Sequence, residues 1–161
     1  MTSKAFDQGE MMAHAHRYMM RVVNAQCKLD GAAAEVERIR SNVGAIGAID
    51  YSKPSTQSST TPDGVHNAAM RLNAAIERVV SSAEEYAAEV ERFNELLPLI
   101  DDGDSIRILV QHYMCGLTWS EVADIIGYSY DHTKSAKREK ALLDLYDAMC
   151  EHHPQSPDTM R

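Results

Sequence analysis

Apolar residues recur along the first half of the chain at alternating steps of four and three. The first run is Met11, Ala15, Tyr18, Val22, Ala25, Leu29, Ala32, Val36, Ile39, Val43 and Ile46. Such heptad spacing places one apolar seam along a helix. The Asp30–Gly31 pair lowers helix propensity without breaking the period, since one internal glycine costs only ~1 kcal/mol relative to alanine. We therefore predict one helix that begins near Met11 and ends near Gly44 or Gly47.

A second seam follows at the same spacing, with charged residues between its apolar positions. It comprises Ala69, Leu72, Ile76, Val79, Ala83, Tyr86, Val90, Phe93 and Leu97. Pro98 disfavours helical geometry at the residue before it, so this helix should stop or kink there. Two seams of similar length can fold back as an antiparallel hairpin or pair between chains as a coiled coil, and the sequence leaves both open. The second seam offers more apolar surface than one partner helix with alanines in its own seam must cover. We therefore expect self-association as a dimer.

The two seams are joined by a connector at about residues 47–64. Asp50 to Gly64 contain Pro54, Pro62 and seven serines or threonines without apolar periodicity. A connection of this length is either a flexible linker or a functional segment. Both interpretations stay open for this stretch, the second with Tyr51 packed on the helices.

A different pattern follows Asp101–Asp104. Ile106, Leu109, Val110 and Tyr113 have helical spacing. Thr118 and Glu121 have the spacing of a capping box at the start of a short helix, which carries Val122, Ala123 and Ile126 on one side. Gly127 permits a sharp left-handed turn, and Ser129 can cap a longer helix that runs to Met149. This predicts a helix-turn-helix in which Trp119 packs the turn between the helices.

The predicted fold is therefore all-α. A helical hairpin or coiled coil occupies residues 1–100, a small trihelical head occupies residues 104–150, and the tail 151–161, with Pro154 and Pro157, is expected to be disordered. Aromatic residues are scarce, which agrees with helix rather than strand. No stretch approaches the ~18 apolar residues of a membrane span and no signal-peptide run is present, so we expect a soluble, cytoplasmic protein. Cys27, Cys115 and Cys150 are expected to be free thiols.

Residues 106–129, which read IRILVQHYMCGLTWSEVADIIGYS, together with the basic helix and Ala141–Leu142 after them, resemble the DNA-binding region four of sigma factors. They resemble still more the small phage-encoded transcriptional regulators of Gram-positive bacteria, of the late-gene activator type, whose Tyr-Ser-Lys-Pro segment is matched by Tyr51–Pro54. Two positions depart from the sigma pattern and bear on the pitch of the recognition helix. Thr133 stands where the pattern has a core-facing valine, and the Ala141–Leu142 pair falls one residue late.

The resemblance implies a sequence-specific regulator of phage or prophage genes that binds double-stranded DNA, with RNA polymerase as a candidate partner. The helix from Ser129 would then lie in the major groove. Its predicted DNA-contacting residues are Tyr130 and Ser135 on base edges, Lys134, Lys137 and Arg138 on phosphates, and Asp131 either on a cytosine amino group or only at the helix terminus. Lys134 and Arg138 are expected to be exposed.

The charge distribution gives this hypothesis limited support. The chain carries −8, whereas residues 129–143 hold four basic and two acidic residues, a local net charge of +2. Because phosphate contacts supply much of the affinity for DNA, one such head would bind weakly without a second head or a partner such as polymerase.

The sequence also leaves other classes of function open. The acidic charge and the long seams also suit a phage assembly or packaging protein that uses its coil and head for protein contacts. His112 with Cys115, and Cys150 with His152 and His153, could ligate zinc, but neither pair has the Cys-x-x-Cys spacing, so no metal site is predicted. No Walker loop, Gly-x-Ser-x-Gly or His-Glu-x-x-His motif occurs, and we predict neither a cofactor nor an enzymatic activity.

Overall fold

The computed structural model describes residues 7–46 and 62–152, with side chains for residues 7–42 and 66–152. All regular elements in these ranges are helical, as the sequence predicts. They are α1 (Gln8–Ile46), α2 (Pro62–Leu96), the 3₁₀ turn η1 (Leu97–Leu99), α3 (Gly103–Ile108), the π-helical η2 (Leu109–Met114), α4 (Trp119–Ile126), α5 (Tyr130–His132), the π-helical η3 (Thr133–Lys137) and α6 (Arg138–His152). The Tyr51–Pro54 segment and residues 153–161 of the expected tail lie outside the described residues.

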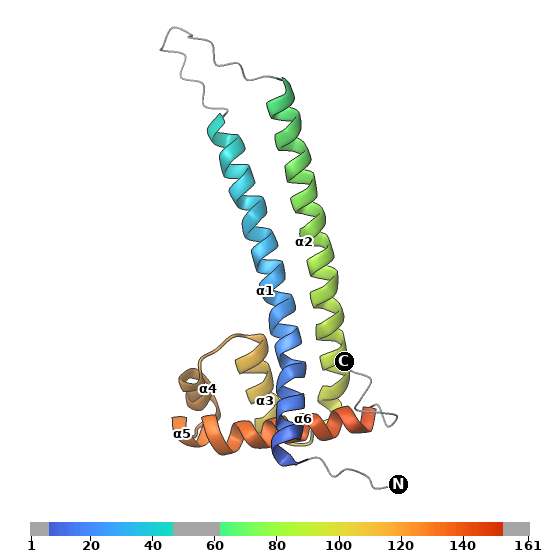
Figure 1. Ribbon diagram of the computed structural model, residues 1–161. Helices are drawn as coiled ribbons and strands as arrows, with labels where there is room; N and C mark the ends of the chain where they lie inside the picture. Colours follow the sequence, from blue (N-terminus) through green and yellow to red (C-terminus); the bar gives the residue numbers. More distant parts are fainter. Residues whose placement is uncertain (1–6, 47–61, 153–161) are drawn as a thin grey trace. The chain divides into compact units, whose positions relative to one another are not determined.

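The two seams form a long antiparallel pair of helices, α1 and α2 (Figure 1). The sequence left open a pair within one chain or between chains, and the structure has the intramolecular hairpin. α1 continues through Gly31, where a Cβ atom would meet open space. α2 begins at Pro62, within the predicted connector, because proline at the first helical position lacks only an N–H that would have no helical partner. It ends at Leu96, and Pro98 lies in η1, as the sequence predicts.

The contacts divide the chain into two compact units. Among the described residues, the first unit comprises 7–24 and 88–152 and the second comprises 25–46 and 62–87. The sequence placed the boundary at Asp101–Asp104, whereas the first unit includes the ends of both long helices. The reason is a shared core, in which Tyr18 and Met19 of α1 and Phe93 of α2 are buried together with Leu142 and Leu145 of α6.

The second unit has a narrow core in which α2 is rotated from its predicted orientation. Val36, Ile39 and Ala75 are buried, and Leu72 and Val79 pack against them. Ile76 was predicted in this seam and is 39 % exposed, and Ala69 is exposed as well, so both assignments are wrong. α1 faces the side of α2 that carries Ala75, whose small side chain takes little space between two helices.

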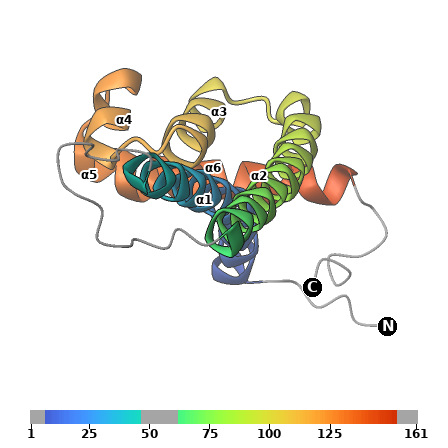
Figure 2. The ribbon, with the colours of Figure 1, turned by 90° about the horizontal axis from the view of Figure 1, so that it is seen from above.

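The core of the first unit is centred on α6, and both views show α4 and α5 near the N-terminal end of α6 (Figures 1 and 2). Ile108 and Leu109 from α3 and η2, Val122 from α4, and Ala141 and Leu145 from α6 are all at most 1 % exposed. The head residues therefore form the trihelical arrangement that the sequence predicts, and Val122 and Ala123 are buried as expected. Ile108 is a core residue that the spacing argument did not include.

Two further expectations can be compared with the described residues. No helix in residues 8–46 or 62–152 is both long and apolar enough to cross a membrane. The three cysteines are free, and all are exposed.

We predict that Phe93→Ala lowers the free energy of unfolding by about 3–5 kcal/mol, because the fully buried ring leaves a cavity between α1, α2 and α6. Denaturant titration followed by circular dichroism measures this change. Leu99→Ala is the control, since Leu99 is 38 % exposed and its truncation should cost less than about 1 kcal/mol. Equal losses for the two variants would contradict the assigned core.

Candidate nucleic-acid interface

The first helix of the predicted helix-turn-helix begins at a complete capping box. The Thr118 side chain accepts from the Glu121 backbone N–H at 3.4 Å, and Glu121 Oε2 accepts from the Thr118 backbone N–H at 2.8 Å. The hydrogen bond from the Thr118 backbone lowers the pKa of Glu121, with a smaller contribution from the Thr118 hydroxyl. The start of α4 is therefore fixed locally, as the sequence predicts.

The turn after α4 also has its predicted geometry. Gly127 has φ of 77°, a left-handed conformation that favours glycine, and its N–H donates to the Ala123 carbonyl at 2.9 Å. Ser129 then caps the next helix, since its Oγ accepts from the His132 backbone N–H at 3.4 Å. These two residues set the direction in which the second helix leaves the turn.

The second helix is continuous from Tyr130 to His152 but contains one π-helical turn. α5 is followed directly by η3 and then by α6. Thr133, at the start of η3, and Ala141 are both fully buried although they are eight residues apart. In a straight α-helix they would point about 80° apart, and a π turn, which adds one residue to a helical turn, reduces this difference. The Ala141–Leu142 pair that falls one residue late in the sequence thus follows a one-residue insertion in the helix.

Four of the predicted DNA-contacting residues are exposed at the start of this helix. They are Tyr130, Asp131, Lys134 and Ser135. The Lys134 amine donates to the Tyr130 hydroxyl at 3.2 Å, so the two side chains lie together on the surface. Ser135 Oγ donates to the Asp131 carbonyl at 2.5 Å. Asp131 is in the first turn, where a carboxylate also favours the helix terminus.

Lys137, the next predicted contact, is held within the head. Its amine forms an ion pair with Asp104 at 2.9 Å and lies 4.1 Å from the centre of the Tyr128 ring. Only 18 % of its side chain is exposed. The hydrogen bond to Asp104, and secondly the contact with Tyr128, raise the pKa of Lys137. The amine therefore remains protonated, but its charge is already balanced by the Asp104 carboxylate.

Arg138 is half-buried, and the expectation that it is exposed is wrong. Its guanidinium lies 5.9 Å from the centre of the Trp119 ring, and its Nε atom is buried without a hydrogen-bond partner. Trp119 in turn stacks on His112, with ring centres 3.8 Å apart. Trp119 therefore packs between the helices as predicted, and Arg138 lies within the range of a cation–π contact with its indole.

Two histidines extend this stack towards α1. His112 Nδ1 lies 2.8 Å from the Leu117 carbonyl, and His16 Nδ1 lies 3.0 Å from the Tyr113 hydroxyl. Burial lowers the pKa of both histidines, and the nearby Arg138 charge lowers both further. The stack from Arg138 to His16 thus connects α6, α4, η2 and α1 while its two histidines favour the neutral form.

Acidic side chains reduce the positive charge that the sequence places on the recognition helix. Lys140 pairs with Asp102 at 2.6 Å and with Asp144 at 2.9 Å, and Lys137 pairs with Asp104. Of the four basic residues in 129–143, only Lys134 is exposed and also forms no ion pair with another described residue. The candidate interface is consequently less cationic than the local count of charges suggests.

Sequence reasoning missed an apolar part of this surface. Ile125 of α4 is 48 % exposed, and Tyr128 of the turn is 41 % exposed, next to Tyr130 at 45 %. His132 is also exposed, with its ring 5.5 Å from that of Tyr128. Ile125 lies about 160° around the helix from Ala123 and about 100° from Ile126, but only about 60° from Val122, so the helical period gave only a weak signal of its exposure.

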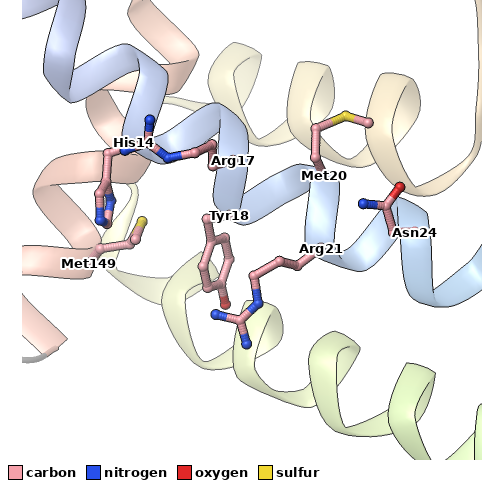
Figure 3. Close-up of a pocket in the computed structure, with 7 residues that line it drawn as sticks. All are labelled: His14, Arg17, Tyr18, Met20, Arg21, Asn24 and Met149. Atoms are coloured by element: carbon pink, nitrogen blue, oxygen red, sulfur yellow. The ribbon is translucent and has the colours of Figure 1, made fainter. Parts of the chain in front are cut away.

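A separate pocket of about 360 Å³ lies along the first half of α1 (Figure 3). It is lined by His14, Arg17, Tyr18, Met20, Arg21, Asn24 and Met149, none of which belongs to α4 or α5. Arg21 is engaged by Glu89 at 2.8 Å, and burial is the main cause that raises the pKa of Tyr18 to about 12. None of the residues that line this pocket is among the predicted DNA contacts.

The zinc alternative gains no support from the described part of the chain. Within it, no three histidine, cysteine, aspartate or glutamate side chains converge as metal ligands. His112 instead stacks on Trp119 and contacts the Leu117 carbonyl. His153 lies outside the described residues.

We predict that the protein loses stability as the pH falls below the ordinary histidine value of 6.5. The folded pKa of His16 and of His112 is lowered, so in this window the unfolded chain binds more protons and stability declines with falling pH. Thermal unfolding from pH 7.5 to 5.5 measures the effect. The double variant His16→Gln/His112→Gln should flatten the profile, whereas the exposed His66→Gln should leave it unchanged. An undiminished slope in the double variant would contradict this origin.

Comparison of the chain with family models, with curated proteins and with solved structures found no significant match. The family resemblance of residues 106–129 therefore stays a hypothesis that depends on those residues.

Proposed function

We propose that this protein is a sequence-specific DNA-binding transcriptional regulator of phage or prophage genes, acting in the cytoplasm through a head similar to sigma factor region four. The observation that carries the proposal is the capped turn from Thr118 to Ser129, which leaves the first turn of the following helix exposed. A helix-turn-helix consists of a short helix, a sharp turn and a second helix, and this head has all three, with a left-handed glycine in the turn and a capped second helix. Such a module places the start of its second helix in the major groove.

Each exposed residue has a role under this proposal. Tyr130 and Ser135 face base edges, where the tyrosine ring can contact a thymine methyl group and the serine hydroxyl can bond to either type of edge. Lys134 binds a phosphate, and Asp131 either accepts from a cytosine amino group or stabilises the helix terminus. Lys137 and Arg138 support this surface from within, because Asp104 and Trp119 hold them in place.

The limited positive charge implies that one head binds DNA weakly. Phosphate neutralisation supplies most non-specific affinity, and two of the lysines in residues 129–143 are paired with aspartates. Useful affinity then requires two linked heads or a contact with RNA polymerase on the same DNA, since linkage raises the effective concentration of the second contact. We include polymerase as a proposed partner on these grounds.

A second candidate function is protein binding by the head in phage assembly or packaging. The observation that favours it is the exposed group of Ile125, Tyr128 and Tyr130. Aromatic side chains are enriched at the centres of protein interfaces, where charged residues are depleted. Indifference to duplex DNA at low salt would favour this function over the first.

We predict that Lys134→Ala weakens binding to every DNA duplex and reduces the salt dependence of binding by about one counterion. Fluorescence anisotropy with a labelled duplex over a series of salt concentrations measures both quantities. Arg71→Ala is the matched control, because Arg71 is an exposed cation on α2 that belongs to the second unit. Unchanged affinity and salt slope for Lys134→Ala would contradict the proposed interface. If Lys134→Ala and Arg71→Ala reduced the affinity and the salt dependence by the same amount, DNA would be bound through non-specific attraction to the whole chain instead.

A further inference from the structure

One side of α2 in the second unit carries small and apolar residues that the hairpin leaves open. This open stripe consists of Ala69, Asn73, Ile76, Val80, Ala83 and Ala87, at steps of four and three, and all of them are exposed except the half-buried Ala83. Val80 is 52 % exposed and Ile76 is 39 % exposed. The stripe is about 27 Å long, at the ~1.5 Å rise per residue of an α-helix.

Ion pairs mark the opposite side of the hairpin. Lys28 pairs with Glu85 at 2.6 Å, and Glu35 pairs with Arg78 at 2.7 Å. Both pairs join α1 and α2 along one flank of the buried seam. On the helical wheel of α2, Val80 and Ile76 lie on the other flank of Ala75 and Val79 from Arg78 and Glu85. The flank of α2 that carries Ile76 and Val80 is therefore apolar, whereas the flank that carries Arg78 and Glu85 is charged. α1 covers only part of the apolar flank.

The residues of the open stripe have the heptad spacing of a coiled-coil seam. Asn73, Val80 and Ala87 take the heptad positions called a, and Ala69, Ile76 and Ala83 take those called d. A single asparagine at a fixes register and oligomer state in coiled coils, because two such amides meet across the axis when the helices are parallel and in register. Asn73 is exposed in the hairpin, and its side chain forms no hydrogen bond with another described residue.

The charges at the edges of the stripe favour a second copy over other partners. Glu77 and Glu84 border the stripe, and their charges disfavour a nucleic acid or an anionic membrane. On α1 the same flank carries Ala33 and Arg40, since these residues lie across the seam from Lys28 and Glu35. The two ion pairs place Glu77 level with Val36, so Arg40 lies about one helical turn away along the axis. Two copies related by an axis parallel to the helices would bring Arg40 of each near Glu77 of the other.

We propose that two copies of this chain associate through the open stripe, with their α2 helices parallel and in register. Ile76 and Val80 form the apolar centre, and the two Asn73 amides bond to each other. A contact of this length with few large side chains is at the small end of stable interfaces, so association is reversible in a concentration-dependent way. The proposal does not depend on DNA binding, although the proposed function would gain two heads from it.

Charge introduced at the centre of the stripe tests the interface. Val80→Glu places two carboxylates in the contact and should raise the dissociation constant roughly 100-fold or more. Ser81→Glu is the matched control, since the same charge one residue further lies outside the stripe and should leave association unchanged. Sedimentation and light scattering of the full chain over a concentration series measure the constant, and circular dichroism melting verifies that both variants fold. A wild-type chain that is monomeric at every concentration overturns the proposal, as does a dimer that Val80→Glu does not weaken.

Cross-linking tests the direction of the helices. In a background with Cys27, Cys115 and Cys150 replaced by serine, Asn73→Cys should form an intermolecular disulfide in a parallel, in-register pair. An antiparallel pair centred on the stripe would hold these residues about 15 Å apart, too far for a disulfide. Asp30→Cys, on the exposed surface of α1, is the control for random collision. A dimer that is sensitive to Val80→Glu but forms no Asn73→Cys disulfide would overturn the parallel arrangement.

Discussion

The helix from Tyr130 to His152 must expose its first turn and also bury a later face in the core. The packing of the rest of the first unit depends on how this helix meets both requirements. Its first turn is exposed, whereas Ala141, Leu142 and Leu145 fill the core between the long helices and α3. Each additional residue in an α-helix rotates everything after it by about 100°. The π turn at Thr133–Lys137 absorbs one residue and so keeps Thr133 and Ala141 both buried. This position of Thr133 is unfavourable in free energy, because its hydroxyl is buried without a hydrogen-bond partner.

The stack of Arg138, Trp119 and His112 extends this dependence to the candidate interface. Trp119 is the first residue of α4, Arg138 is the first residue of α6, and His112 belongs to η2. Their contacts fix the short helix, the recognition helix and the helix before them in one arrangement. The direction of the exposed first turn is therefore set by packing as well as by the Gly127 turn. An arginine that sequence reasoning assigned to phosphate contact performs a structural role here.

The same competition for side chains affects the electrostatics of the head. Asp102, Asp104 and Asp144 neutralise Lys137 and Lys140, so the surface retains Lys134 together with Ile125, Tyr128 and Tyr130. A surface of this composition suits a protein that relies on two linked heads or on a second macromolecule more than on charge alone. The long hairpin supplies the open stripe through which two chains can be linked.

The sequence by itself determined the features that depend on local geometry. Heptad periods predict both long helices, and Thr118, Gly127 and Ser129 predict the caps and the turn, because capping bonds and left-handed backbone involve residues at most a few positions apart. Tertiary structure decided what depends on distant partners. It buried Ala75 in place of Ile76, since the rotation of α2 about its axis is fixed by contact with α1. It likewise drew Lys137 to Asp104 and Arg138 to Trp119, because a long cationic side chain has several possible partners and only the packed fold selects among them.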